Sequence, residues 1–264
     1  MTSSSESAQL ELFDRAKALS FPNGLIALST VAVTMLFIGA WMVFFYAPEE
    51  KVMGYVQKIF YFHVPAAWAM LLSAPLLAIG AIAFLATRKD VYDRLADAGV
   101  ELAILFGFMV IISGPLWGRK AWGVFWVWDV RLTSTMVMVL TLVACKIVRG
   151  YAGPEAKTIS AGLSILALLN AIFVWFAVDI WSGTHPPKLV QKLEPRMKLT
   201  LWFCVGAFTM AYLALLWARL RSGRLRTAVR RSRPAAPADG RSCDQWDGKL
   251  GTASSLTCCM VSRR

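Results

Sequence analysis

Two histidines, His63 and His185, are the only imidazoles in the chain, and a proline follows each within two residues. Neutral imidazole is a strong ligand for haem iron, and two imidazoles can hold one iron from opposite faces. The neighbouring prolines restrict the backbone and so limit how far each ring can move. A single histidine is also often a capping or packed side chain. The two residues alone therefore leave both an iron-binding role and a packing role open.

Four tryptophans lie within a short, glycine-broken run: Trp117, Trp122, Trp126 and Trp128, with Phe125 among them and Gly118 and Gly123 between them. Tryptophan favours the interface between membrane and water, which accounts for one or two rings at a helix end. Glycine permits tight turns, and these could lay the rings out as a platform for a flat, conjugated ligand. An interfacial belt and a ligand platform both remain open as interpretations.

Charged residues accompany the tryptophans. Arg119, Lys120 and Arg131 could pair with the two propionates of haem or, equally, with lipid phosphates. Asp129 could pair with Arg131, orient a ligand histidine, or cap a helix that starts near Leu132. Zinc fits poorly, because a zinc site needs three or four protein ligands and the expected outer loops contain no cysteine.

The composition indicates a membrane protein. Of 264 residues, 57% are hydrophobic and 17% charged, and the mean hydropathy is +0.55. These values exclude a disordered chain, a small disulfide scaffold and most soluble enzymes. The net charge is +12, and its excess is concentrated in a tail, since 11 of the 28 Lys and Arg lie from Arg219 onward. We therefore expect no nucleic-acid partner.

Six stretches are long and apolar enough to cross a bilayer core about 30 Å thick, which takes about 20 helical residues. They are residues 25–46, 64–86, 100–116, 132–148, 159–181 and 199–220. Because lipid offers the backbone no hydrogen-bond partner, each must be a helix, and the fold class is an all-α, polytopic membrane protein with six transmembrane helices. The third and fourth are short and should cross with little tilt. Pro75 predicts a kink in the second, and Asp179 lies deep in the fifth.

The distribution of basic residues predicts the orientation. With six spans, 19 of the 28 Lys and Arg fall on the face that holds both termini, and the positive-inside rule makes that face cytoplasmic. The Trp-rich segment and both histidines then lie on the outer face. We expect three regions: a cytoplasmic lead-in (1–24), the membrane domain (25–220) with its outer Trp-rich segment (114–134), and a basic, disordered cytoplasmic tail (221–264).

Three segments resemble a known family. Residues 122–134 (WGVFWVWDVRLTS) look like the tryptophan-rich "WWD" signature of haem-handling proteins in cytochrome c maturation. Residues 58–68 (KIFYFHVPAAW) are similar to the first histidine motif of the haem exporter protein C family of system I, and residues 114–118 (GPLWG) to the lead-in of its signature. The resemblance covers about residues 25–220. Phe125 departs from it, because the family usually has tryptophan there.

The resemblance implies a haem-binding function without catalysis. His63 and His185 would be the axial ligands of a non-covalent haem b, with Trp122, Trp126, Trp128 and Asp129 lining its platform. Trp117, Arg119 and Arg131 complete the candidate site. The family holds haem at the periplasmic side of the bacterial inner membrane and loads it onto a haem chaperone, the system I protein E. A small membrane protein D and the ABC transporter subunits A and B act with it.

Other classes fit the sequence less well. The related system II assembly proteins share the signature but carry more spans and additional histidines. A membrane cytochrome b places its histidine pairs inside adjacent spans, and a membrane glycosyltransferase needs acidic metal ligands and a soluble catalytic domain. A solute transporter without haem remains an alternative, although the sequence has no internal repeat or pair of broken spans that favours it.

Overall fold

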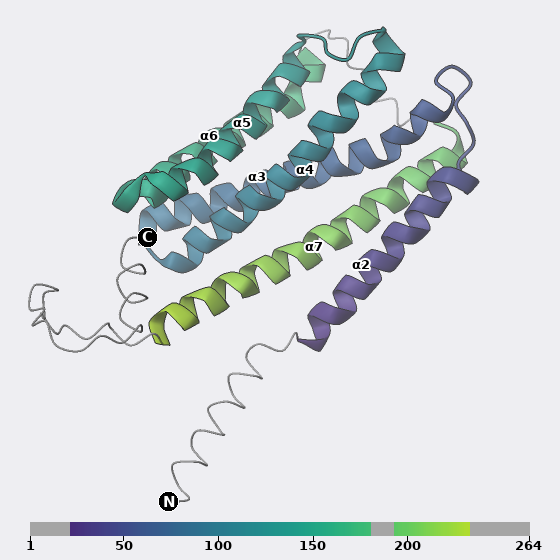
Figure 1. Cartoon of the computed structure of the whole chain (residues 1–264). Helices are drawn as coiled ribbons and strands as arrows, with labels where there is room; N and C mark the ends of the chain where they lie inside the picture. Colours follow the sequence, from purple (N-terminus) through teal and green to yellow (C-terminus); the bar gives the residue numbers. More distant parts are fainter. Residues whose placement is uncertain (1–21, 181–192, 233–264) are drawn as a thin grey trace, which may run out of the picture. The chain divides into compact units, whose positions relative to one another are not determined.

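The computed structural model describes residues 22–180 and 193–232, with side chains for 22–177 and 193–225. Within these ranges the long elements are all helices, in the order shown in Figure 1. They are α2 (Asn23–Trp41) with the π-helical η1 (Met42–Tyr46), the 3₁₀ helix η2 (Tyr55–Ile59) leading into α3 (Phe60–Thr87), α4 (Asp90–Trp122), α5 (Val130–Tyr151), the short η3 (Gly153–Glu155), α6 (Ala156–Ile180) and α7 (Pro195–Ser232). Six of the helical segments are long and apolar enough to cross a membrane, which confirms the predicted all-α, six-span fold of a multi-pass membrane protein.

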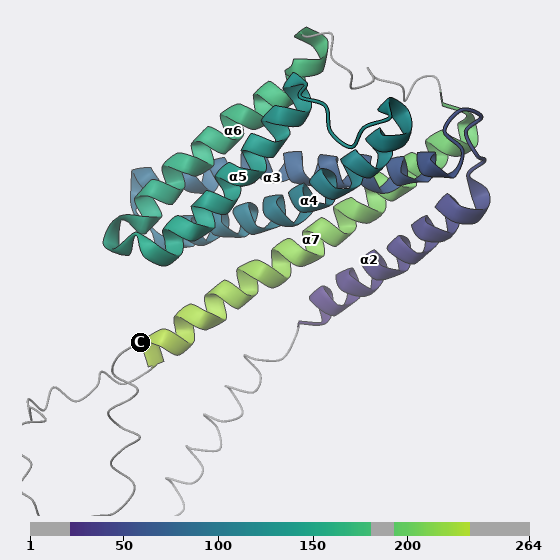
Figure 2. The same cartoon turned by 45° about the horizontal axis from the view of Figure 1, so that its top comes forward.

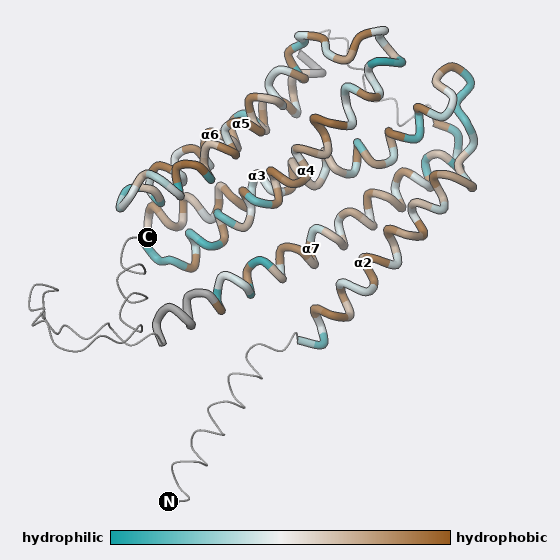
Figure 3. The backbone as a smooth tube through the Cα atoms, viewed as in Figure 1, coloured by the Kyte–Doolittle hydropathy of each residue, from teal (hydrophilic) through white to brown (hydrophobic). Residues whose placement is uncertain are grey.

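The predicted lengths of the third and fourth spans are wrong. α4 has 33 residues and α5 has 22, whereas the apolar stretches alone predicted 100–116 and 132–148. At about 1.5 Å per residue α4 is about 50 Å long, so it must tilt or project beyond a ~30 Å hydrocarbon core. The apolar stretch ends where charges begin, but the helix continues until its backbone is capped. Figure 3 shows this difference, with hydrophilic residues on the terminal turns of otherwise hydrophobic helices.

The last helix also exceeds its prediction. α7 continues to Ser232, so the first residues of the expected tail are helical. The chain divides into two compact units, residues 1–226 and 227–264, and all six spans belong to the first. Residues 1–21 of the predicted lead-in and the tail beyond Ser232 lie outside the described residues, and residues 23 and 24 of the lead-in belong to α2.

Close backbone contact joins α3 to α4. A Cβ at Gly80 of α3 would lie 2.5 Å from the backbone nitrogen of Ala96, and one at Gly99 of α4 would lie 2.8 Å from Cβ of Leu77. Small residues allow this approach between membrane helices. α5 packs along α6, and α3 also contacts α6, as both Figure 1 and Figure 2 show.

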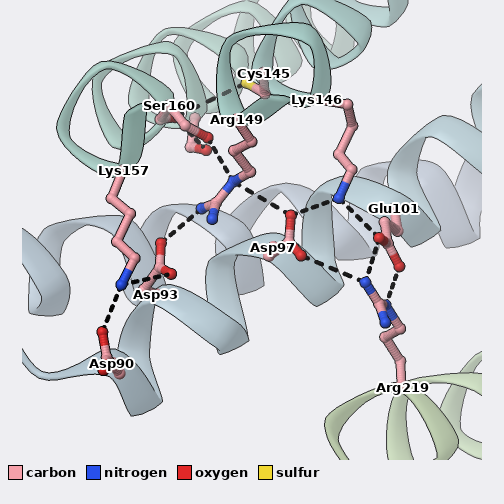
Figure 4. A network of polar contacts seen from close by, with 11 residues as sticks. Asp90, Asp93, Asp97, Glu101, Cys145, Lys146, Arg149, Lys157, Ser160 and Arg219 are labelled. Carbon is pink, nitrogen blue, oxygen red and sulfur yellow. Dashed lines mark hydrogen bonds and ion pairs between the residues drawn. The ribbon is translucent and has the colours of Figure 1, made fainter. Parts of the chain in front are cut away.

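An ion network ties four helices together at the N-terminal end of α4, far from its Trp-rich end (Figure 4). Its acidic members lie three or four positions apart on α4 and so share one face of the helix: Asp90, Asp93, Asp97 and Glu101. Its basic members are Lys146 and Arg149 of α5, Lys157 of α6 and Arg219 of α7.

Arg149 is the best buried cation of this network. Its Nη2 lies 2.7 Å from Oδ1 of Asp93 and its Nε lies 3.2 Å from Oδ1 of Asp97. The same Nε donates to Oγ of Ser160 at 2.9 Å. The charge distribution used the four basic residues of this network only to predict the orientation of the chain in the membrane. Their contacts show that they also join α4 to α5, α6 and α7.

Candidate functional site

The Trp-rich segment is half helix and half irregular connection. Trp117 and Trp122 lie on the last turns of α4, whereas Trp126 and Trp128 lie in the non-helical residues 123–129. Of the predicted outer segment 114–134, residues 114–122 belong to α4 and 130–134 to α5, so only residues 123–129 form the connection between the two helices. Arg119 and Lys120 in the last turn of α4 suit the negative end of the helix dipole and help the helix extend so far.

The tryptophan rings form two perpendicular pairs. Trp117 and Trp122 lie 5.6 Å apart between ring centroids with an interplanar angle of 89°, and Trp126 and Trp128 lie 5.9 Å apart at 77°. Edge-to-face contact is favoured because the ring edge is positive and the ring face negative. The four rings therefore do not form one flat layer. Trp128, 75% exposed, offers the largest open surface of the four.

Glycine and arginine shape the turn that presents these rings. Gly123 ends α4 with φ +80°, a left-handed conformation that glycine adopts easily, and its N–H donates to the carbonyl of Arg119 at 3.1 Å. The Arg119 guanidinium donates to the carbonyl of Gly123 and lies 5.5 Å from the ring centroid of Phe125. Arg119 thus stabilises the turn through contacts with Gly123 and Phe125. Its pairing with a haem propionate stays a prediction.

Asp129 caps the N-terminus of α5, which confirms one of the three roles predicted for it. Its Oδ1 accepts the backbone N–H of Leu132 at 2.8 Å, and α5 begins at Val130. This bond satisfies one of the amides that a helix N-terminus leaves without a partner. Arg131 lies in the first turn of α5 and is partly buried.

His63 lies in the first turns of α3 and faces α4. Its Nδ1 lies 2.9 Å from Oγ of Ser113, and a Cβ on Gly114 would lie 3.3 Å from its Cε1. One turn further along α4, Nε1 of Trp117 donates to Oε1 of Gln57 at 3.5 Å. The first histidine and the start of the Trp-rich segment are therefore neighbours. His185 and the side chain of Asp179 lie outside the described residues.

Sequence reasoning missed three residues that order this end of the molecule: Gln57, Lys58 and Ser113. Lys58, the first residue of the histidine motif, is buried, donates to the carbonyl of Phe44 at 2.9 Å and lies 5.2 Å from the ring centroid of Tyr55. It joins the end of the first span to the start of α3. The only signal for Ser113 was its position four residues before Trp117, which places both on one helix face.

The chemistry of His63 and of the tryptophan rings fits a flat ligand that carries an iron and carboxylates. Nε1 of Trp126 is buried and has no hydrogen-bond partner within the described part of the chain, so this indole offers a donor to a ligand oxygen. His63 offers an imidazole. Among the described residues, no three His, Cys, Asp or Glu gather as a metal site would require.

Comparison with known proteins places the chain in a family. The family model described as "Heme exporter protein C" matches residues 12–235. The chain is 30% identical over 210 residues to "Heme exporter protein C" of Bradyrhizobium diazoefficiens, covering 77% of this chain and 80% of that protein. It is 28% identical over 201 residues to the Escherichia coli K12 protein of the same name, covering 74% and 81%. A "Putative cytochrome c biosynthesis ccmC-like mitochondrial protein" of Marchantia polymorpha is 26% identical over 166 residues, covering 63% and 69%. The chain therefore belongs to the heme exporter protein C family.

Proposed function

We propose that this protein binds haem b non-covalently at the periplasmic face of a bacterial inner membrane and delivers it to a haem chaperone during cytochrome c maturation. Family membership supports haem handling. The observation that carries the site assignment is the position of His63 against Ser113 and Gly114, directly before the Trp-rich end of α4. The role is binding and delivery without catalysis.

In this proposal His63 and His185 are the two axial ligands. His185 follows Ile180, the last residue of α6, by five positions. α5 and α6 pack along each other and are joined by the short η3, so the end of α6 lies at the same end of the bundle as the start of α5. The proposal requires that the five residues after Ile180, which span at most about 18 Å when fully extended, bring His185 to the same iron as His63.

The aromatic and charged groups complete the binding surface. Trp117, Trp122, Trp126 and Trp128 supply apolar area against the porphyrin. The N–H of Trp126 and the guanidinium groups of Arg119 and Arg131 would bind the propionates. Asp129 holds the end of the Trp-rich connection through its cap on α5. The partners in this proposal are the haem chaperone (system I protein E), the small membrane protein D and the ABC transporter subunits A and B.

Complementation tests the function directly. In a bacterial strain that lacks its own heme exporter protein C, expression of this chain should restore covalent haem staining of c-type cytochromes. The double variant His63→Ala, His185→Ala should restore almost none, although it reaches the membrane in equal amount. Lys157→Ala, which alters an exposed ion pair far from the site, serves as control. Equal staining with the unaltered protein and the double variant would reject the two histidines as haem ligands. If the protein were a solute transporter without haem, neither the unaltered protein nor the double variant would restore staining.

The tryptophans of the irregular connection should contribute affinity. We expect Trp126→Ala with Trp128→Ala to weaken haem binding about 10- to 100-fold, since each aromatic contact adds about 0.5–1.5 kcal/mol beyond its buried area and 1.4 kcal/mol is a factor of ten. Haem titration of the purified protein measures this.

The matched control for these rings is Trp175→Ala with Trp202→Ala, two exposed tryptophans on the spans α6 and α7. This pair should bind haem like the unaltered protein. If the two double variants bind equally well, the connection is an interfacial belt and not part of a haem site.

A further inference from the structure

The Ser113 hydroxyl has two neighbours and only one proton. Its Oγ lies 2.5 Å from the carbonyl oxygen of Met109 and 2.9 Å from Nδ1 of His63. A carbonyl oxygen can only accept, so the hydroxyl proton is directed to Met109. Oγ must then accept the second hydrogen bond, and Nδ1 of His63 is its donor. The ring proton of His63 therefore belongs on Nδ1.

This assignment fixes which nitrogen can bind a metal. A neutral imidazole carries one N–H, so a proton on Nδ1 leaves the lone pair on Nε2. A hydrogen bond from the other ring nitrogen is the usual device that sets the tautomer and orientation of a ligand histidine.

We propose that Ser113 and Gly114 are positioning residues that hold His63 in the Nδ1–H tautomer and present Nε2 to the iron of haem. This inference rests on the proposed haem-binding function. Gly114 acts by its size, since a Cβ there would lie 3.3 Å from Cε1 of His63 and would press on the ring. Both residues lie on α4 within four positions of Trp117, so one helix sets the ring and begins the aromatic surface.

A structural role for Ser113 is the competing explanation. Serine hydroxyls in helices often bond the carbonyl four residues earlier and do nothing else. Ser222 of α7 does this, with its Oγ 2.9 Å from the carbonyl oxygen of Ala218. Ser222→Ala is therefore a matched control for loss of such a hydroxyl away from the site.

Nitrogen NMR of haem-free, full-length protein tests the tautomer without any haem readout. The chain has only two histidines, so the His185→Ala variant, purified without a histidine tag and labelled with ¹⁵N-histidine, reports His63 alone. We expect a protonated Nδ1 and an unprotonated Nε2. Adding Ser113→Ala should shift the ring toward the Nε2–H form that free histidine prefers in water. A protonated Nε2 with an unprotonated Nδ1 before that change would overturn the inference.

Haem titration tests the consequence. Ser113→Ala should bind added ferric haem about 10- to 100-fold more weakly, the usual loss when a ligand histidine loses its hydrogen-bond partner. Ser113→Thr, which keeps the hydroxyl, should bind nearly normally, as should Ser222→Ala. If His63→Ala abolishes binding but Ser113→Ala leaves the affinity unchanged, the positioning role fails and the proposed function stands. If the unaltered protein binds no haem, the proposed function fails.

Discussion

His63→Ala is expected to lower the affinity of the purified protein for haem by more than about 100-fold. Loss of a hydrogen bond behind a ligand histidine already costs about 10- to 100-fold, and loss of the ligand itself removes the bond to the iron. His63 lies at the α3–α4 contact beside Ser113, so its substitution removes one contact between these two helices. Haem titration in detergent measures the effect.

Rescue by free imidazole distinguishes loss of the iron ligand from loss of folding. His63→Gly with added imidazole should recover much of the haem binding, because free imidazole can occupy the space that the side chain leaves. His185→Ala should cause a loss of the same order as His63→Ala. Affinity that is unchanged in either single variant would remove that histidine from the ligand set.

Arg149→Ala is expected to lower the free energy of unfolding by about 3–5 kcal/mol, the cost of breaking a buried ion pair by removal of one partner. Only 15% of the Arg149 side chain and 9% of the Asp93 side chain are exposed. The substitution leaves Asp93 and Asp97 near each other without the guanidinium that lies between them. Unfolding by SDS in mixed micelles gives the free energy.

Lys157→Ala provides the matched comparison in the same network. Lys157 and its partner Asp90 are 47% and 55% exposed, and exposed ion pairs contribute about 0–1 kcal/mol. We expect a small change for Lys157→Ala and a large one for Arg149→Ala. Equal effects would mean that burial of the Arg149 pair adds nothing to the stability of the helix bundle.

Hydropathy was sufficient to predict the six spans but not their ends. Apolar runs locate helices in lipid because the backbone there has no other partner. Helix ends depend on caps and charges, which is why α4 extends from Asp90 to Trp122 across residues that had been assigned to connections. The ion pairs of Asp90, Asp93, Asp97 and Glu101 were not predicted, because their partners come from α5, α6 and α7 and sequence spacing does not reveal contacts between helices.

The site shows the same division between local and long-range information. The Asp129 cap follows from a local preference and was one of the predicted roles. Three other features depend on three-dimensional packing: the perpendicular tryptophan pairs, the hydrogen bond from Arg119 to Gly123, and the contact between His63 and Ser113. The functional assignment came from the resemblance of the histidine and tryptophan motifs to a family, and the comparison with known proteins confirmed membership of that family.

We propose that two imidazoles, from His63 and His185, bind one haem iron. An absorption spectrum of the purified protein with one equivalent of haem, recorded oxidised and reduced, tests it most directly. We predict a low-spin, six-coordinate iron in the unaltered protein, and loss of that signature in both His63→Ala and His185→Ala. A spectrum that is the same in all three proteins would contradict the claim.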